Sequence, residues 1–126
     1  MKDSAKTKKF NIYLKKIGGL NNGFYTDRPP IMSRDFFSIG DGWLKIVQKL
    51  IEDCLKLGWD KEICQVKEQL GGIRFYTNNM PEGMHELILK AEDLSFNTCA
   101  VCGKPGKLMK GKSGWFYTSC KKHKDK

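Results

Sequence analysis

Two pairs of metal-ligating side chains lie in the last 28 residues, and they limit the possible folds more than any other feature of the chain. The first pair is the C-x-x-C of CAVCGKPG, and the second is the C-x-x-H of CKKH, with 17 residues between them. A C-x-x-C turn points two thiolates at one cation, and a second pair completes a closed tetrahedral set. We expect a structural zinc ion held by Cys99, Cys102, Cys120 and His123. The alternative is two unrelated thiol pairs with redox activity, and His123 is the weakest of the four ligands because it lies in a lysine-rich tail.

Between the two pairs, residues 106–113 read GKLMKGKS, which matches the pattern of a phosphate-binding P-loop. A P-loop requires a buried strand before it and a helix after it, because the phosphate binds at the N-terminus of that helix. Here a cysteine pair precedes the match and the aromatic segment GWFYTSC follows it. We therefore interpret the match as a coincidence, and predict a zinc-ribbon hairpin with strands at 107–110 and 115–118 and a turn at 111–114.

Charge is concentrated at the two ends of the chain. The net charge of +9 divides into +5 over residues 1–17, −3 over 18–98 and +7 over 99–126. We predict an α+β domain over residues 1–98, including a basic N-terminal arm over 1–9, and a zinc-binding ribbon with a basic tail over 99–126. Cationic ends attract polyanions, and the alternative is that these lysines form solvated tails.

The chain contains no apolar run of about 18 residues that would span a bilayer. Its start, MKDSAKTKKF, is charged but has no apolar segment after it, so a secretory signal is not expected. We therefore expect a cytoplasmic protein with no membrane partner. In that reducing compartment, five cysteines are thiols or metal ligands rather than disulfides.

Hydrophobic periodicity indicates two helices. Steps of three and four predict an amphipathic helix over residues 43–57, with Asp41 as its N-cap and Cys54 buried on its apolar face. The same spacing predicts a second helix over residues 81–96, with His85 on the surface.

Alternating residues indicate strands. FNIYL at 10–14 predicts a short strand, and the pattern around Gly71 and Gly72 predicts a β-hairpin over 63–77. The expected fold class is α+β, with two helices packed on a small antiparallel sheet and a C-terminal zinc-ribbon hairpin.

Three blocks of the sequence, GDGW (40–43), QVKEQLGGIRFY (65–76) and CAVCGKPG…GWFYTSCKKH (99–123), occur in this order and spacing in a family that the chain resembles. The family consists of small proteins common in tailed-phage and prophage genomes, and the resemblance covers residues 38–123. It implies an α+β fold with a C-terminal zinc knuckle, and a phage-encoded protein that acts in the bacterial cytoplasm. Family members often carry a cysteine just before GDGW, where this chain has Ile39. The family has no settled activity, so the resemblance implies a setting and not a mechanism.

We find no nucleophile–base–acid set in the sequence, and expect a binding protein rather than an enzyme. The first hypothesis is counter-defence, in which the protein sequesters a phosphate-bearing nucleotide signal of bacterial immunity. Arginines clamp phosphate and aromatic rings stack on bases. The candidate contacts are Arg74, Tyr76, Trp43, Arg34 and Arg28. The alternative for Trp43 and Tyr76 is a purely structural place in the core.

Two further hypotheses stay open. The cationic ribbon, with Trp115, Phe116 and Tyr117 among its lysines, has the mixture of charge and stacking surface that binds single-stranded DNA or RNA. Alternatively, the ribbon is a rigid platform that docks on a host enzyme and inhibits it, with the lysines steering it to an acidic surface. Exposed aromatic residues between positions 24 and 37 would suit a homodimer interface.

Overall fold

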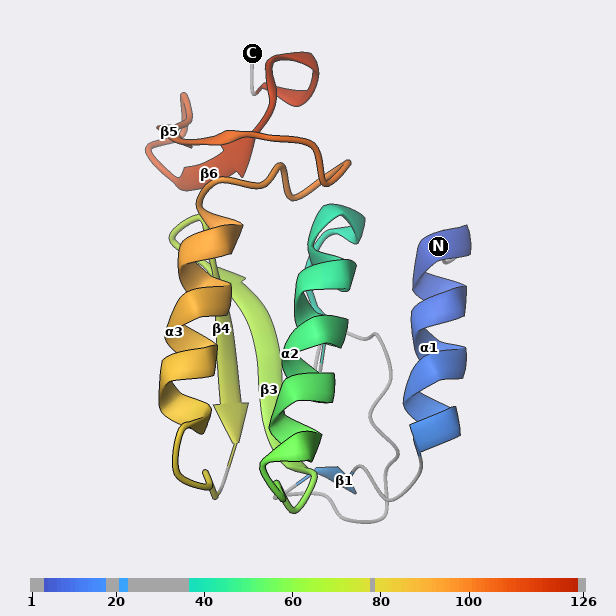
Figure 1. Ribbon diagram of the computed structural model, residues 1–126. Helices are drawn as coiled ribbons and strands as arrows, with labels where there is room; N and C mark the ends of the chain where they lie inside the picture. The colour runs from blue at the N-terminus through green and yellow to red at the C-terminus, as the bar shows by residue number, and fades with distance from the viewer. Residues whose placement is uncertain (1–3, 18–20, 23–36, 78, 125–126) are drawn as a thin grey trace.

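The computed structural model describes residues 4–17, 21–22, 37–77 and 79–124. The described residues form an α+β fold, as predicted, in which three helices lie side by side and a separate hairpin covers one end of them (Figure 1). In chain order the elements are α1 (Ala5–Ile17), β1 (Asn21–Asn22), β2 (Phe37–Ser38), η1 (Asp41–Trp43), α2 (Leu44–Lys56), β3 (Glu62–Gln69), β4 (Gly72–Thr77), α3 (Met84–Ser95), β5 (Lys107–Lys110), β6 (Phe116–Ser119) and η2 (Lys121–His123).

Helix α1 occupies the segment that we predicted as a strand at 10–14, so that prediction was wrong. Ser4 caps the helix, because its Oγ accepts a hydrogen bond of 3.0 Å from the backbone N–H of Thr7. Thr7, Phe10 and Leu14 are buried, and their spacing of three and four residues places them on one helical face. The five-residue window FNIYL was too short to separate this period from an alternating one.

Helix α2 confirms the predicted amphipathic helix, and Cys54 is fully buried on its apolar face. The predicted N-cap was wrong, because no side chain caps this end of the helix. Asp41 instead accepts a hydrogen bond of 3.0 Å at its Oδ1 from the hydroxyl of Thr7, which connects the start of α2 to α1. Helix α3 confirms the second predicted helix, and His85 is exposed on it as expected.

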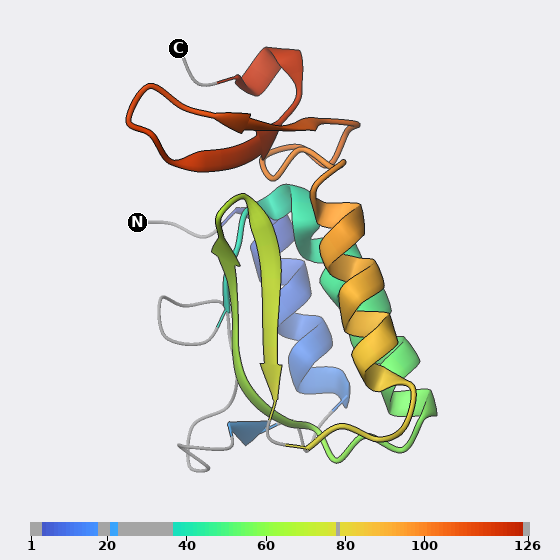
Figure 2. The same cartoon turned by 90° about the vertical axis from the view of Figure 1, so that its left-hand side faces the viewer.

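The β3–β4 hairpin is confirmed, with antiparallel pairs such as Val66 with Phe75. Its turn runs through Leu70 and Gly71, both at positive φ. The short strands β1 and β2 pair with β3 in parallel, with Phe37 opposite Val66 for example. The sheet is therefore mixed, whereas the sequence analysis predicted a purely antiparallel one. All three helices lie on one side of this sheet (Figure 2).

One hydrophobic core fills the space between the helices and the sheet. Trp59 is buried beside the Phe75 ring, at 5.9 Å between ring centroids, and its indole N–H donates to the Thr77 hydroxyl at 3.0 Å. The largest fully buried side chains are Trp43, Ile51, Ile63, Met84, Val47 and Val66.

Residues 99–123 form a ribbon that consists of a segment at 99–106, the β5–β6 hairpin and η2. This ribbon rests on one end of the preceding α+β body. Two glycines of the GDGW block make this contact with their backbone. The N–H of Gly42 donates to the Ala100 carbonyl at 2.8 Å. A Cβ atom on Gly42 would lie 2.0 Å from the Cys99 carbonyl oxygen, and one on Gly40 would lie 2.1 Å from the Ala100 oxygen. Only glycine permits the two backbones to approach this closely.

Two side-chain hydrogen bonds complete the contact between the ribbon and the body. The Trp43 indole N–H donates to the carbonyl of Thr98 at 2.8 Å, and the Thr118 hydroxyl donates to the carbonyl of Gly71 at 2.7 Å. The Gly71 position is also crowded, since a Cβ there would lie 2.4 Å from Cδ1 of Leu108. All three sequence blocks therefore meet at this contact.

We predict that Gly42→Ala undocks the ribbon, because a Cβ there overlaps backbone atoms that cannot move aside. Overpacking of this kind costs about 1–3 kcal/mol, which urea denaturation measures. Trypsin should then cleave the lysine-rich ribbon faster than in the wild type, as followed by mass spectrometry.

Gly58→Ala is the matched control. Gly58 has φ of +85°, but a Cβ there meets nothing within 4 Å. This change strains the backbone by about 1–2 kcal/mol and should leave the ribbon as resistant to trypsin as before. Equal tryptic rates in both variants would contradict the docking contact.

Candidate metal centre

The four predicted ligands converge at one end of the ribbon. The ligand atoms of Cys99, Cys102, Cys120 and His123 all lie within 4.8 Å of one another. The Cys102 and Cys120 sulfurs are 3.7 Å apart, and Nδ1 of His123 lies 3.3 Å from the Cys120 sulfur and 3.7 Å from the Cys99 sulfur. This cluster of three cysteines and one histidine can hold a metal ion such as zinc.

The distances fit a tetrahedral ion. Zinc–sulfur bonds of about 2.3 Å place two sulfurs of a tetrahedron about 3.8 Å apart. The separation of 3.7 Å between the Cys102 and Cys120 sulfurs agrees with this value. It is far longer than the roughly 2.05 Å of a disulfide. Soft thiolate and imidazole donors in this geometry favour zinc over hard cations such as magnesium.

A tight turn after α3 positions the first two ligands, Cys99 and Cys102. The N–H of Cys99 donates to the Lys104 carbonyl at 2.7 Å, and the N–H of Gly103 donates back to the Cys99 carbonyl at 2.9 Å. Gly103 has φ of +81°, a conformation that glycine adopts without strain. We call residues 99–104 the knuckle.

Strand β6 and the one-turn helix η2 supply the other two ligands. Cys120 directly follows β6, and the N–H of His123 donates to the Cys120 carbonyl at 3.2 Å. This single turn brings the imidazole over the Cys120 sulfur. The hairpin itself agrees with the sequence prediction to within one residue, because β5 spans Lys107–Lys110 and β6 spans Phe116–Ser119.

The knuckle backbone favours the thiolate form of Cys99. Burial by itself raises the pKa of this thiol, but hydrogen bonds from the backbone of Cys102, Cys120 and Val101 outweigh burial and lower the pKa to about 6. At Cys102 a backbone hydrogen bond from Lys104 favours a lower pKa. Burial, hydrogen bonds with the Cys99 and Cys120 thiols and the negative charge of Cys99 outweigh it, so the pKa of Cys102 is raised.

Cys54 has the opposite environment. It is fully buried in the core, and this burial, together with the nearby Asp53 carboxylate, raises the pKa of its thiol to about 12. Cys54 is thus a packing residue, in agreement with the sequence analysis.

The five residues predicted to contact a phosphate-bearing ligand do not form one set. Trp43 has no exposed surface, and its ring is fixed in the core by the hydrogen bond to Thr98, so it offers no face to a ligand. Arg28 and Arg34 lie outside the described residues.

Arg74 and Tyr76 do share a pocket, of about 280 Å³, between β4 and α3. The Arg74 guanidinium is half-buried there and forms an ion pair with Glu92 of α3. Tyr76 is exposed, with the Lys67 amine 5.9 Å from its ring centroid. His85 of α3 also lines this pocket.

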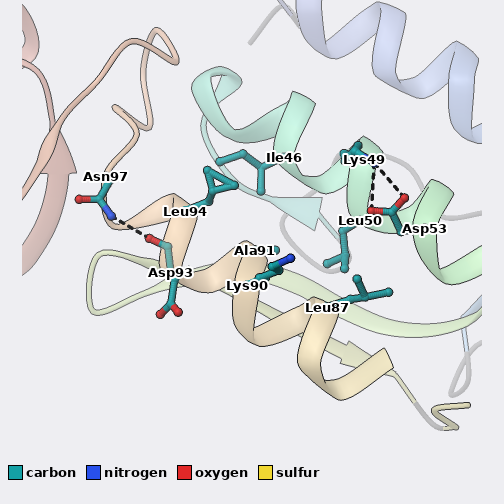
Figure 3. A pocket seen from close by; sticks show the side chains of 10 residues that line it. All are labelled: Ile46, Lys49, Leu50, Asp53, Leu87, Lys90, Ala91, Asp93, Leu94 and Asn97. Atoms are coloured by element: carbon teal, nitrogen blue, oxygen red, sulfur yellow. Dashed lines mark hydrogen bonds and ion pairs between the residues drawn. The ribbon is translucent and has the colours of Figure 1, made fainter. Parts of the chain in front are cut away.

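A larger groove of about 590 Å³ runs between α2 and α3 (Figure 3). Aliphatic side chains such as Ile46, Leu87 and Leu94 line it. Lys49, which also lines it, pairs with Asp53 at 3.0 Å. Among the described residues, those that line the groove include no histidine, cysteine or hydroxyl side chain.

The sequence analysis missed the docking glycines and a group of lysines, Lys6, Lys9 and Lys45, that line a further cavity beside the knuckle. The signal for the glycines was the G-x-G spacing of Gly40 and Gly42 in the GDGW block. Lys6 and Lys9 belong to the basic arm predicted over residues 1–9, but their proximity to Lys45 had no sequence signal, because the three lysines come from two separate helices.

Comparisons of the chain with models of protein families, with curated proteins and with solved structures find no match. Within the part of the chain that the structure describes, no helix has both the length and the apolar character to cross a membrane.

We predict that the purified protein contains one zinc ion per chain by elemental analysis, and that Cys102→Ser lowers this content severely. A strong chelator should make the ribbon sensitive to trypsin, because a hairpin of this size depends on its metal for stability.

Cys54→Ala serves as the control, since it removes a thiol that lies outside the cluster and should retain the full zinc content. A protein that holds no zinc, and whose ribbon resists trypsin equally with and without chelator, would exclude the metal centre.

Proposed function

We propose that this chain is a non-enzymatic, zinc-stabilised binding protein that contacts single-stranded nucleic acid through its ribbon. The observation that carries the proposal is the exposure of two aromatic rings there. Trp115 is 71% exposed and Phe116 is 42% exposed, at the tip of the hairpin and at the start of β6. Rings of this size are usually buried, and exposed ones mark interaction surfaces.

Exposed lysines lie along the same ribbon, and Lys110 is opposite Phe116 in the β5–β6 register. The six exposed lysines of the ribbon are Lys104, Lys107, Lys110, Lys112, Lys121 and Lys122. Single-strand binding proteins combine such cations, which follow the phosphate backbone, with aromatic faces on which bases stack. The adjoining surface continues onto the body, because Gln69 and Leu70 of the β3–β4 turn line one pocket with Trp115 and Phe116.

A closed set of four protein ligands supports a structural role for the metal, since it leaves no position for an activated water. The α2–α3 groove is lined by aliphatic, lysine, aspartate and asparagine side chains, and no histidine, cysteine or hydroxyl is among its described lining residues, so it gives no support for catalysis there. Both features favour a binding function over an enzymatic one.

The second candidate is sequestration of a phosphate-bearing nucleotide signal in the pocket of Arg74 and Tyr76. The observation that favours it is that these two residues, predicted as contacts, line one pocket together with His85. A ligand phosphate would have to compete with Glu92 for the guanidinium. In the setting that the resemblance implies, a phage protein in the bacterial cytoplasm, such binding would counteract host immunity. Inhibition of a host enzyme is the third candidate. In that case a host protein should co-purify with this chain even after nuclease treatment.

For the ribbon, we predict that Trp115→Ala weakens binding of a fluorescent oligothymidylate about tenfold, because one stacked base contributes about 1–3 kcal/mol. Lys110→Ala with Lys112→Ala should reduce the dependence of log affinity on log salt by about 1.4, from two lost phosphate contacts. Fluorescence anisotropy measures both effects.

Leu89→Ala and Lys56→Ala are the controls and should leave oligothymidylate affinity unchanged, because both side chains are exposed on helices away from the ribbon. Absence of any complex at low salt would overturn the nucleic-acid proposal.

For the second candidate, calorimetry against cyclic di- and trinucleotides and ADP-ribose derivatives should detect binding that Tyr76→Ala abolishes. Phe116→Ala removes an exposed ring from the ribbon instead and should leave that binding unchanged. If no compound in the panel gives a heat signal with the wild type, the nucleotide-signal hypothesis is wrong.

A further inference from the structure

A cavity of about 520 Å³ lies where α1, the start of α2 and the knuckle meet. Helix α1 contributes Lys6 and Lys9, and α2 contributes Lys45 and Gln48. The N-terminal ends of both helices lie at the end of the body where the ribbon is attached (Figure 1). Cys102 and Gly103 of the knuckle also line the cavity.

The lysines of this cavity outnumber its one carboxylate by three to one. Lys6, Lys9 and Lys45 are exposed, and none forms an ion pair within the described part of the chain. The one carboxylate among the lining residues, Asp41, accepts the hydrogen bond from the Thr7 hydroxyl. Three ammonium groups around one cavity repel one another, and an anion placed among them would relieve that repulsion.

Part of the remaining lining is apolar. Phe10 of α1 with Leu44 and Ile46 of α2 supplies an apolar wall, whereas Asp41, Gln48 and Thr98 are polar. The volume falls within the range of roughly 300–1,000 Å³ that is usual for small-ligand sites. A ligand that suits both halves of the cavity combines phosphate groups with a flat, weakly polar ring system.

We propose that this cavity binds a nucleoside phosphate, with Lys6, Lys9 and Lys45 on the phosphate groups and the apolar wall and Gln48 on the base. A free nucleotide and the 5′-phosphorylated end of a strand share this chemistry. The site shares no lining residue with the pocket of Trp115 and Phe116 or with the pocket of Arg74 and Tyr76.

The position of the cavity couples it to the metal centre. Cys102 and Gly103 contribute to its lining, so the cavity is complete only when the knuckle is folded. Binding that requires a folded knuckle must, by reciprocity, stabilise that knuckle in return. A bound nucleotide should therefore slow the release of zinc to a chelator.

The test is a calorimetric titration of the zinc-loaded full chain with ATP, AMP and tripolyphosphate. We expect ATP to bind, and Lys9→Ala with Lys45→Ala to weaken it about a hundredfold, because a hydrogen bond to a charged group contributes about 1.5–3 kcal/mol. Lys8→Ala with Lys56→Ala removes the same charge from the same two helices outside the cavity, and should change the affinity less than threefold. Trp115→Ala should leave ATP binding intact, which separates this site from the ribbon.

Octathymidylate with and without a 5′-phosphate identifies the source. Tighter binding of the phosphorylated strand assigns the site to a strand end, and equal binding of the two strands alongside ATP binding assigns it to a free nucleotide. ATP should also slow zinc transfer to a chromophoric chelator in the wild type, but not in Lys9→Ala with Lys45→Ala. The proposal is overturned if ATP does not bind, if tripolyphosphate binds as tightly as ATP, or if the control pair weakens binding equally.

Discussion

The close approach of two backbones, at Gly40 and Gly42 on one side and the knuckle on the other, determines how the ribbon is held. The ribbon has few buried side chains of its own, so its position depends on this contact, on the hydrogen bond from Trp43 to Thr98, and on the metal-ligand cluster. The knuckle that carries two of the candidate ligands also presents the Ala100 carbonyl to the Gly42 N–H. A metal ion held by the cluster would therefore be coupled to docking, because both require the same conformation of residues 99–104.

Much of this structure follows from local patterns in the sequence. The sequence predicted helices α2 and α3 because their hydrophobic periods extend over about a dozen residues. It predicted both hairpins from their glycine turns, and it predicted the four ligands from the specific spacing of the two pairs. Helix α1 was missed since its apolar face includes Thr7, a polar residue that is buried because it donates to Asp41. The parallel strands β1 and β2 are two residues long and pair with β3 far along the chain, so no local pattern indicates them.

The three sequence blocks gain a common explanation from their positions. In the sequence they indicate a family resemblance, and two of them supply Trp43, Arg74 and Tyr76 as candidate ligand contacts. GDGW, the glycine turn at 71–72 and the knuckle meet one another in space. Gly72 lies against the Phe96 ring, and the Gly71 carbonyl accepts the Thr118 hydroxyl hydrogen bond. The glycines of the blocks are thus explained by close packing. The surfaces that remain for partners are the ones these blocks hold in place: the exposed rings, the pocket of Arg74 and the lysine-lined cavity.

The three tryptophans occupy very different environments, which has a practical consequence. Trp43 and Trp59 are enclosed in the core, whereas the Trp115 indole extends into solvent. The intrinsic fluorescence of the protein thus contains a blue-shifted and a red-shifted component. The Trp43 indole is hydrogen-bonded to Thr98, immediately before the first cysteine ligand, so its emission wavelength reports the attachment of the ribbon. Quenching of Trp115 reports the binding of a partner at the hairpin tip. The two events can be distinguished optically without any added label.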